Sequence, residues 1–234
     1  MSLNLWRDLF ERSLSLLRTV VAEASDEKYS HSLVEAYLQR HANSIVWLAD
    51  DAKVLIENGC IAAVPLIVRS MLESGFILAA AVNEPGFAGE KMLREVINFR
   101  KRITFRLGQD PLVSEFDELE CRIREECNFT GSPRNLNVKE TADIAKLDIH
   151  YQFEYFLYSQ HTHAEIGGLT ARHFEESLPA RNLSTMAYVL SLAAGFTPQL
   201  LKTETPQLHV DRAAAIIGEL VDARAKDPPI AGEK

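Results

Sequence analysis

Two polar couples stand out in otherwise apolar stretches of the sequence. Arg69 and Glu73 lie four residues apart in IAAVPLIVRSMLESGFILAAAV, and Ser159 and His163 lie four residues apart in YQFEYFLYSQHTHAEIGG. Side chains at positions i and i+4 share one face of an α-helix, so each couple presents two polar groups together. Charged groups are rarely buried without a partner, so we expect a buried polar site where the two helices meet.

These residue types favour recognition of an anion. We expect Arg69 to hold a phosphate or carboxylate group and Glu73 to orient the arginine. Tyr155 precedes Ser159 by the same four-residue spacing, so its hydroxyl extends the polar stripe towards His163. The expected ligand-binding residues are Arg69, Glu73, Tyr155, Ser159 and His163.

A structural explanation is also open for both couples. Glutamate before arginine is the better order on an exposed helix, and the order here is reversed, so a surface pair selected for helix stability is a poor explanation. Arg69 and Glu73 could instead form a buried ion pair that ties helices together, although such pairs add little net stability. Ser159 could likewise bond a neighbouring side chain within aromatic core packing.

Other reactive patterns are weak. Ser159 lacks the G-x-S-x-G turn that exposes a nucleophilic serine. His161 and His163 are two residues apart and would point to nearly opposite sides of a helix, so we expect no metal site and no cofactor. The basic run from Phe99 to Arg106 could bind RNA, but a solvated face explains it better. The remaining isolated histidines lie in polar surroundings and are predicted at the surface: His31, His41, His173 and His209.

Composition limits the class of protein. The chain has 234 residues, of which 47% are hydrophobic and 25% charged, as in ordinary globular proteins. A net charge of −8 argues against a broad surface for nucleic acid or an anionic membrane. Three cysteines without a C-x-x-C motif, and an N-terminus unlike a signal peptide, favour reduced thiols in a cytoplasmic protein. Residues 61–82 are long enough to span a membrane, but Arg69 and Glu73 near their middle favour a core helix.

Helical periodicity dominates the sequence, and we find no convincing strand alternation. Asn137 followed by Glu140 resembles a capping box, and Asn58-Gly59 resembles a helix C-terminus. We predict an all-α fold in which residues 1–226 form a single multi-helix bundle and residues 227–234 form a flexible C-terminal tail. The alternative is a chain divided into two domains at the loop 128–137. The first predicted helix includes Leu5 to Val20 and ends near the polar segment at residues 25–32. The later ones are Leu33–Glu57, Cys60–Val82, Ala88–Leu107, Leu112–Glu126, Asn137–Leu147, Tyr151–His163, Leu183–Lys202 and Pro206–Lys226.

The two motifs carry a resemblance. Arg69-Ser70-x-x-Glu73, followed by Tyr155-x-x-x-Ser159-x-x-x-His163, resembles an uncharacterised, largely bacterial all-helical family catalogued as a domain of unknown function. The likeness runs from about Ser44 to Leu169, and the tryptophan that often precedes the tyrosine helix in that family is missing here. The family is similar in outline to the HEPN (higher eukaryotes and prokaryotes nucleotide-binding) helical proteins. Many of those are dimeric ribonucleases of toxin and phage-defence systems, so the resemblance implies an HEPN-like bundle that forms a homodimer.

Three functions therefore stay open. The first is a soluble bundle that binds a small anionic ligand or nucleotide at the polar site. The second is a metal-independent ribonuclease in which His163 acts as general acid or base and Arg69 stabilises the phosphorane charge. The catalytic motif of the HEPN ribonucleases is an arginine, four to six intervening residues, and then a histidine on the same helix. No histidine of this sequence has an arginine at that distance upstream, so Arg69 and His163 would come from separate helices. The third is a structural dimerisation module whose polar core fixes helix register.

Overall fold

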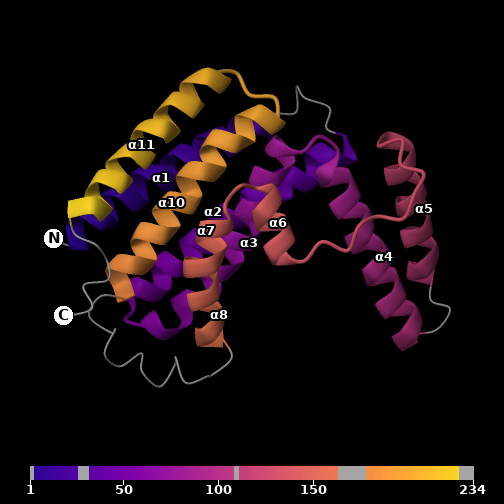
Figure 1. Cartoon of the computed structure of the whole chain (residues 1–234), viewed down its shortest axis with the longest axis horizontal. Coiled ribbons are helices and arrows are strands. Elements are labelled where there is room, and N and C mark those ends of the chain that lie inside the picture. Colours follow the sequence, from indigo (N-terminus) through magenta and orange to yellow (C-terminus); the bar gives the residue numbers. More distant parts are fainter. Residues whose placement is uncertain (1–2, 26–31, 108–110, 163–177, 227–234) are drawn as a thin grey trace.

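The chain is built from helices in the computed structural model, which describes residues 3–25, 32–107, 111–162 and 178–226. No strand occurs within these ranges, so the predicted all-α class is confirmed (Figure 1). The elements are α1 (Leu3–Ala24), α2 (Leu33–Glu57), the 3₁₀ turn η1 (Ile61–Ala63), α3 (Val64–Asn83), α4 (Phe87–Leu107), α5 (Pro111–Glu126), α6 (Val138–Ile144), α7 (Asp148–His150), the π turn η2 (Tyr151–Tyr155), α8 (Phe156–Thr162), α10 (Leu178–Leu200) and α11 (Pro206–Lys226). The predicted tail at 227–234 lies outside the described residues.

Most of the predicted helices occur, with differences at their ends. Helix α2 has the predicted bounds, whereas α10 begins at Leu178 instead of Leu183. The predicted helix that begins at Cys60 starts as a 3₁₀ turn, and Pro65 then occupies the first turn of α3, where its missing N–H costs little. The predicted Tyr151–His163 helix opens with a π turn, which four-residue spacing does not reveal.

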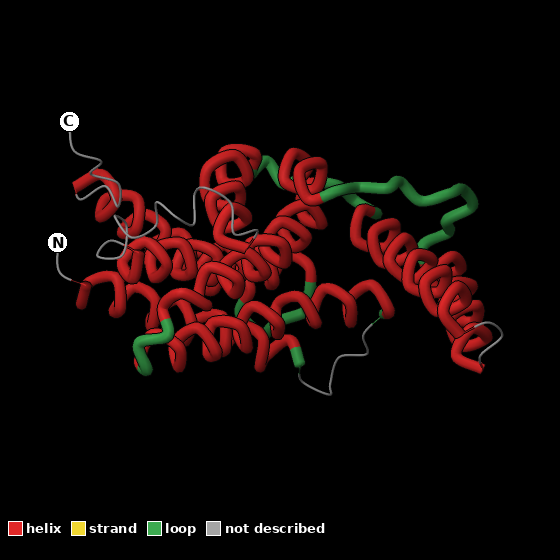
Figure 2. The backbone as a smooth tube through the Cα atoms, turned by 90° about the horizontal axis from the view of Figure 1, so that it is seen from below, coloured by secondary structure: helices red, strands yellow, loops and turns green. Residues whose placement is uncertain are grey.

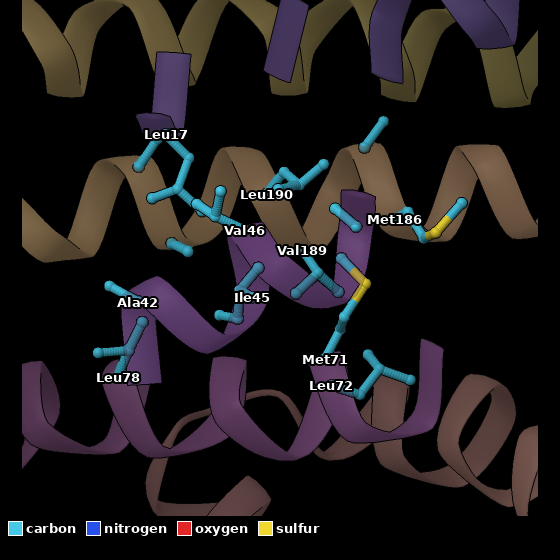
Figure 3. Close-up of a cluster of buried hydrophobic side chains, with 14 of the residues drawn as sticks. Leu17, Ala42, Ile45, Val46, Met71, Leu72, Leu78, Met186, Val189 and Leu190 are labelled. Atoms are coloured by element: carbon cyan, nitrogen blue, oxygen red, sulfur yellow. The ribbon is translucent and has the colours of Figure 1, made fainter. Parts of the chain in front are cut away.

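Helices α3 and α10 form the centre of the core. Helix α3 packs against α2 and α10, and α10 also packs against α1 and α11 (Figure 1). Buried side chains from α1, α2, α3 and α10 point towards one another, among them Leu17, Ile45, Met71 and Leu190 (Figure 3). Helices α6 and α8 cover another part of α3. The helix that carries Arg69 and Glu73 is therefore in contact with α2, α4, α6, α8 and α10.

The same helix accounts for the apolar stretch noted in the sequence. Among the described residues, one segment, Ile61–Asn83, is both long enough and apolar enough to cross a membrane. The protein buries 56% of the most apolar part of this segment. The central helix of a folded bundle has the same composition, so the signal is weak evidence for a span.

Side chains complete the starts of two helices. Ser32 and Glu35 form a capping box at α2, and Asn137 and Glu140 form the predicted one at α6. The carboxylate of Glu126, the last residue of α5, also accepts the N–H groups of Leu33 and Val34 at 3.0 and 3.1 Å. Because the first N–H groups of a helix have no partner within it, this glutamate joins α5 to the start of α2.

Of the histidines predicted at the surface, His209 is buried and His41 is partly buried. His209 is only 1% exposed, and its Nε2 lies 2.9 Å from Glu23 Oε2 and 3.2 Å from Thr205 Oγ1, which joins α11 to the end of α1. His41 lies between α2 and α3, with Nδ1 3.3 Å from Ser74 Oγ, and burial lowers its pKa to about 4. The sequence prediction failed because the polar neighbours in sequence are not the neighbours in space. His31 and His173 lie outside the described residues.

A buried ionic network holds the π turn on α10 and α11. Glu154 Oε2 lies 2.9 Å from His150 Nδ1, and Glu154 Oε1 lies 3.1 Å from the Arg224 guanidinium. Thr185 of α10 donates to the same carboxylate at 3.4 Å. Burial alone would raise the pKa of Glu154, but the hydrogen bond to His150 and the charge of Arg224 outweigh it, so the pKa lies below its ordinary value.

We predict that Glu154→Gln lowers the free energy of unfolding by about 3 kcal/mol, because it leaves the Arg224 charge buried without its anion. The pKa of Glu154 is lower in the folded state than in the unfolded state. Ionised Glu154 therefore stabilises the folded protein fully above its unfolded-state pKa, and this stabilisation is lost as the pH falls through its folded-state pKa. Chemical denaturation should therefore show that the free energy of unfolding falls less steeply in the variant than in the wild type as the pH is lowered from neutral to below 4.5. The exposed Glu57→Gln serves as control, and equal pH slopes for wild type and Glu154→Gln would refute the expectation.

A second prediction concerns the close approach of α4 to the chain after α5. A Cβ added at Gly89 would lie 2.4 Å from Cys127 Sγ, whereas one added at Gly218 in α11 meets nothing within 4 Å. Gly218→Ala should raise the unfolding free energy by up to about 1 kcal/mol through helix propensity. Gly89→Ala should instead lower it by about 1–3 kcal/mol through overpacking, and adding Cys127→Ala should recover most of that loss. Equal stability of the two alanine variants in urea denaturation would show that the contact is not tight.

Candidate functional site

Arg69, Glu73 and Tyr155 form a closed triangle of polar contacts between α3 and the π turn. Arg69 Nε–H donates to Glu73 Oε1 at 3.3 Å and to the Tyr155 hydroxyl at 3.2 Å. The Tyr155 hydroxyl in turn donates to Glu73 Oε1 at 2.8 Å. The guanidinium also lies over the tyrosine ring, 5.2 Å from its centroid, within cation–π distance. Three of the five predicted ligand-binding residues thus lie together.

The backbone explains how the tyrosine reaches α3. Tyr155 is the last residue of η2, where hydrogen bonding shifts from the usual i+4 to the i+5 partner. Its ring stacks on Tyr151 with centroids 5.1 Å apart and lies 6.2 Å from Phe76 of α3. The preceding residue, Glu154, bonds to groups on α10 and α11. Adjacent residues of the π turn are therefore fixed to different helices.

The tyrosine hydroxyl keeps its proton in this environment. Burial, followed by the hydrogen bond to the Glu73 carboxylate, raises the pKa of Tyr155 above its ordinary value. At neutral pH the hydroxyl is therefore a donor to Glu73, and its oxygen accepts from Arg69. The carboxylate and the phenol together fix one edge of the guanidinium plane, which sets the direction of its other N–H groups.

The triangle lies at the edge of the core, less buried than the sequence suggested. The Arg69 side chain is 27% exposed and that of Glu73 39% exposed. Leu66, an apolar residue three positions before Arg69 on α3, is 53% exposed. A solute can therefore reach the arginine from outside, whereas the His150–Glu154–Arg224 network is more enclosed.

The structure does not test the second polar couple as a pair. Ser159 lies on α8, one turn beyond Tyr155, is partly buried, and belongs to a helix that packs against α3. His163 lies outside the described residues. The meeting of Arg69 with His163 therefore stays a prediction.

Neither a metal-binding cluster nor a cavity in the described structure identifies a second candidate site. Among the side chains that the structure describes, no group of three histidine, cysteine, aspartate or glutamate residues is arranged to hold a metal ion. A groove of about 370 Å³ lies between α1 and α11, where Arg12 and Arg212 contribute to its wall. Arg12 is bound there at both terminal nitrogens by Glu219, at 2.6 Å each, so its charge is already matched.

Sequence reasoning missed one polar couple in the same region. His150 and Glu154 are four residues apart, so the spacing rule that selected Arg69 and Glu73 could also have found them. Arg224 is 70 residues further along the chain and has no sequence signal that links it to Glu154. Only the packing of α11 brings its guanidinium to the carboxylate.

Comparison with known proteins gives a family but no activity. Residues 35–179, more than half of the chain, match the family described as "Family of unknown function (DUF5677)". No curated protein and no solved structure matches the chain. The match begins in the first turn of α2, continues past α8 and includes all five predicted ligand-binding positions. The HEPN likeness stays a prediction. This all-helical chain belongs to DUF5677, a family of unknown function.

Proposed function

We propose that this protein binds a small anionic ligand, such as a nucleotide or another phosphate- or carboxylate-bearing solute, at Arg69. The observation that carries the proposal is the fixed yet accessible arginine. Glu73 and Tyr155 hold its Nε–H, and 27% of its side chain remains exposed. An arginine whose fork is oriented in advance loses less conformational entropy when it binds a planar or tetrahedral anion.

The neighbouring residues support an anion over a cation or an apolar ligand. The single negative charge in the triangle, Glu73, is already bonded to both Arg69 and Tyr155. Hydroxyl donors such as Ser159 on the adjoining helix could complete the coordination of an oxyanion. In this proposal His163 would add a titratable donor beside the ligand.

The structural alternative makes a different prediction about the same contacts. If Arg69 and Glu73 only tie α3 to the π turn, replacing either residue changes stability and leaves no ligand affinity to lose. The exposure of both side chains argues against this reading, because exposed ion pairs contribute only about 0–1 kcal/mol to stability.

We predict that Arg69→Gln abolishes most of the affinity for the ligand. Isothermal titration calorimetry with inorganic pyrophosphate, citrate and AMP should show binding by the wild type to at least one probe. Loss of a charge-assisted contact of about 1.5–3 kcal/mol should raise Kd about ten- to a hundredfold in the variant. Arg69→Lys keeps the charge but loses the planar fork, so an intermediate Kd is expected.

The matched control is Arg122→Gln, an exposed arginine on α5 that should leave Kd unchanged. Circular dichroism establishes that each variant retains its helices. The proposal fails if no probe binds, or if the control weakens binding as much as Arg69→Gln. Cleavage of RNA by the wild type, lost in both Arg69→Gln and His163→Ala with helices intact, would instead identify the ribonuclease.

A further prediction separates orientation of the arginine from its charge. Tyr155→Phe removes the hydroxyl that bridges Arg69 and Glu73 but leaves both charges in place. Loss of a contact of about 1 kcal/mol should raise Kd about fivefold. Tyr37→Phe removes a comparable tyrosine–glutamate bond, to Glu95 at 3.1 Å, and should leave Kd as it is. An unchanged Kd in Tyr155→Phe would show that the hydroxyl does not position the arginine.

A further inference from the structure

Helices α4 and α5 form a hairpin that extends away from the rest of the bundle. Figure 2 shows the two helices side by side at the far end of the molecule, and Figure 1 places them apart from α1, α10 and α11. At its base the hairpin has a small core of its own, separate from the main one. We call residues 98–106 of α4 and 113–122 of α5 the arm. The small core consists of Met92, Leu93, Ile97 and Ile123.

The arm does not bury its own apolar groups. No side chain within residues 98–106 or 113–122 is fully buried. Phe99 and Phe116 meet edge to face with centroids 5.1 Å apart, yet Phe99 is 51% exposed and Phe105 is 91% exposed. Helices gain most of their stability by packing an apolar face, so two helices that cover each other this poorly need another surface.

The charges on the two helices of the arm are mostly of opposite sign, with Arg122 at the base of α5 as the one basic residue on the acidic helix of the arm. Arg100 connects them by ion pairs to Asp117 and Glu120. On the outer surface of α4, Lys101, Arg102 and Arg106 are exposed, and no acidic partner is found for them among the described side chains. Glu115 and Glu118 are likewise exposed on α5, one helical turn apart and without a basic partner in the described structure.

We propose that two copies of this chain pair through their arms, with α4 of each copy lying against α5 of the other. A twofold axis between the hairpins would bring the basic face of one against the acidic face of the other at two equivalent places. The two hairpins would form a four-helix bundle, and Phe99 and Phe105 would become part of its interior. The surface is thus self-complementary in both charge and apolar content.

A single-stranded RNA is the competing occupant, because exposed phenylalanines beside arginines can stack bases and bind phosphates. The acidic residues of α5 lie on the same narrow arm, and they would repel a polyanion that follows the basic face. The net charge of −8 acts in the same direction. A second copy of the chain can pair with both the basic face of α4 and the acidic face of α5, whereas RNA can pair only with the basic face.

The experiment exchanges the charges on the two faces. One variant carries Arg102→Glu with Arg106→Glu, and the other carries Glu115→Lys with Glu118→Lys. By light scattering after gel filtration, the wild type should have twice the 26.3 kDa mass of the chain. Each variant alone brings like charges together at both contacts and should be monomeric, with the dimer Kd raised at least about tenfold. An equimolar mixture restores opposite charges and should return to the mass of a dimer.

The control variant, Lys139→Glu with Lys202→Glu, makes the same change in net charge at exposed positions outside the arm and should stay dimeric. Phe105→Ser changes no charge and should also weaken the dimer, because it removes an apolar contact. Circular dichroism checks that every variant is folded. A wild type that is monomeric at its highest soluble concentration overturns the proposal, and so does a dimer that survives in both charge variants. Binding of single-stranded RNA by a monomeric wild type, lost with Arg102→Glu and Arg106→Glu, would assign the arm to RNA.

Discussion

The π turn at Tyr151–Tyr155 constrains the arrangement of both polar clusters. Its last two residues, Glu154 and Tyr155, are neighbours in sequence but are bonded to different parts of the bundle. Tyr155 contacts Arg69 and Glu73 on α3, and Glu154 contacts Thr185 on α10 and Arg224 on α11. A wider turn is rare in helices and often marks functional positions. Here it fixes three helices relative to one short segment.

The two clusters differ in how far solvent reaches them. Around Glu154, a histidine, an arginine and a threonine all approach one enclosed carboxylate, and this arrangement is suited to holding helices together. Around Arg69, the fixed groups occupy one edge of a guanidinium that solvent still reaches. Buried ion pairs add little stability over apolar packing but are costly to break, so the enclosed cluster gives the edge cluster a rigid support.

Local signals in the sequence were sufficient for most of the fold. The bounds of α2 and the capping box at Asn137 follow from side chains that act on their own backbone, and so they could be predicted. The i,i+4 contact of Arg69 with Glu73 is equally local. The burial of His209 and the contact of Arg224 with Glu154 depend on residues far away in sequence, and a single sequence does not contain those distances.

The candidate site was predictable to the same degree. Spacing placed Tyr155 on the polar stripe, but only the packing of the π turn against α3 shows that its hydroxyl meets both members of the first couple. The degree of exposure of Arg69 could not be read from its apolar neighbours, because Leu66 on the same face is itself at the surface. The family match identifies the protein's relatives but assigns no role to these residues.

The central place of α10 has a consequence for synthesis on the ribosome. This helix, which covers α3 and joins it to α1 and α11, is made after α1, α2 and α3. Until Leu178–Leu200 leaves the exit tunnel, the apolar residues of α3 that it later covers have to be shielded by transient partners or chaperones. The nascent chain can form its early helices one by one, but the native core closes only after α10 has been made.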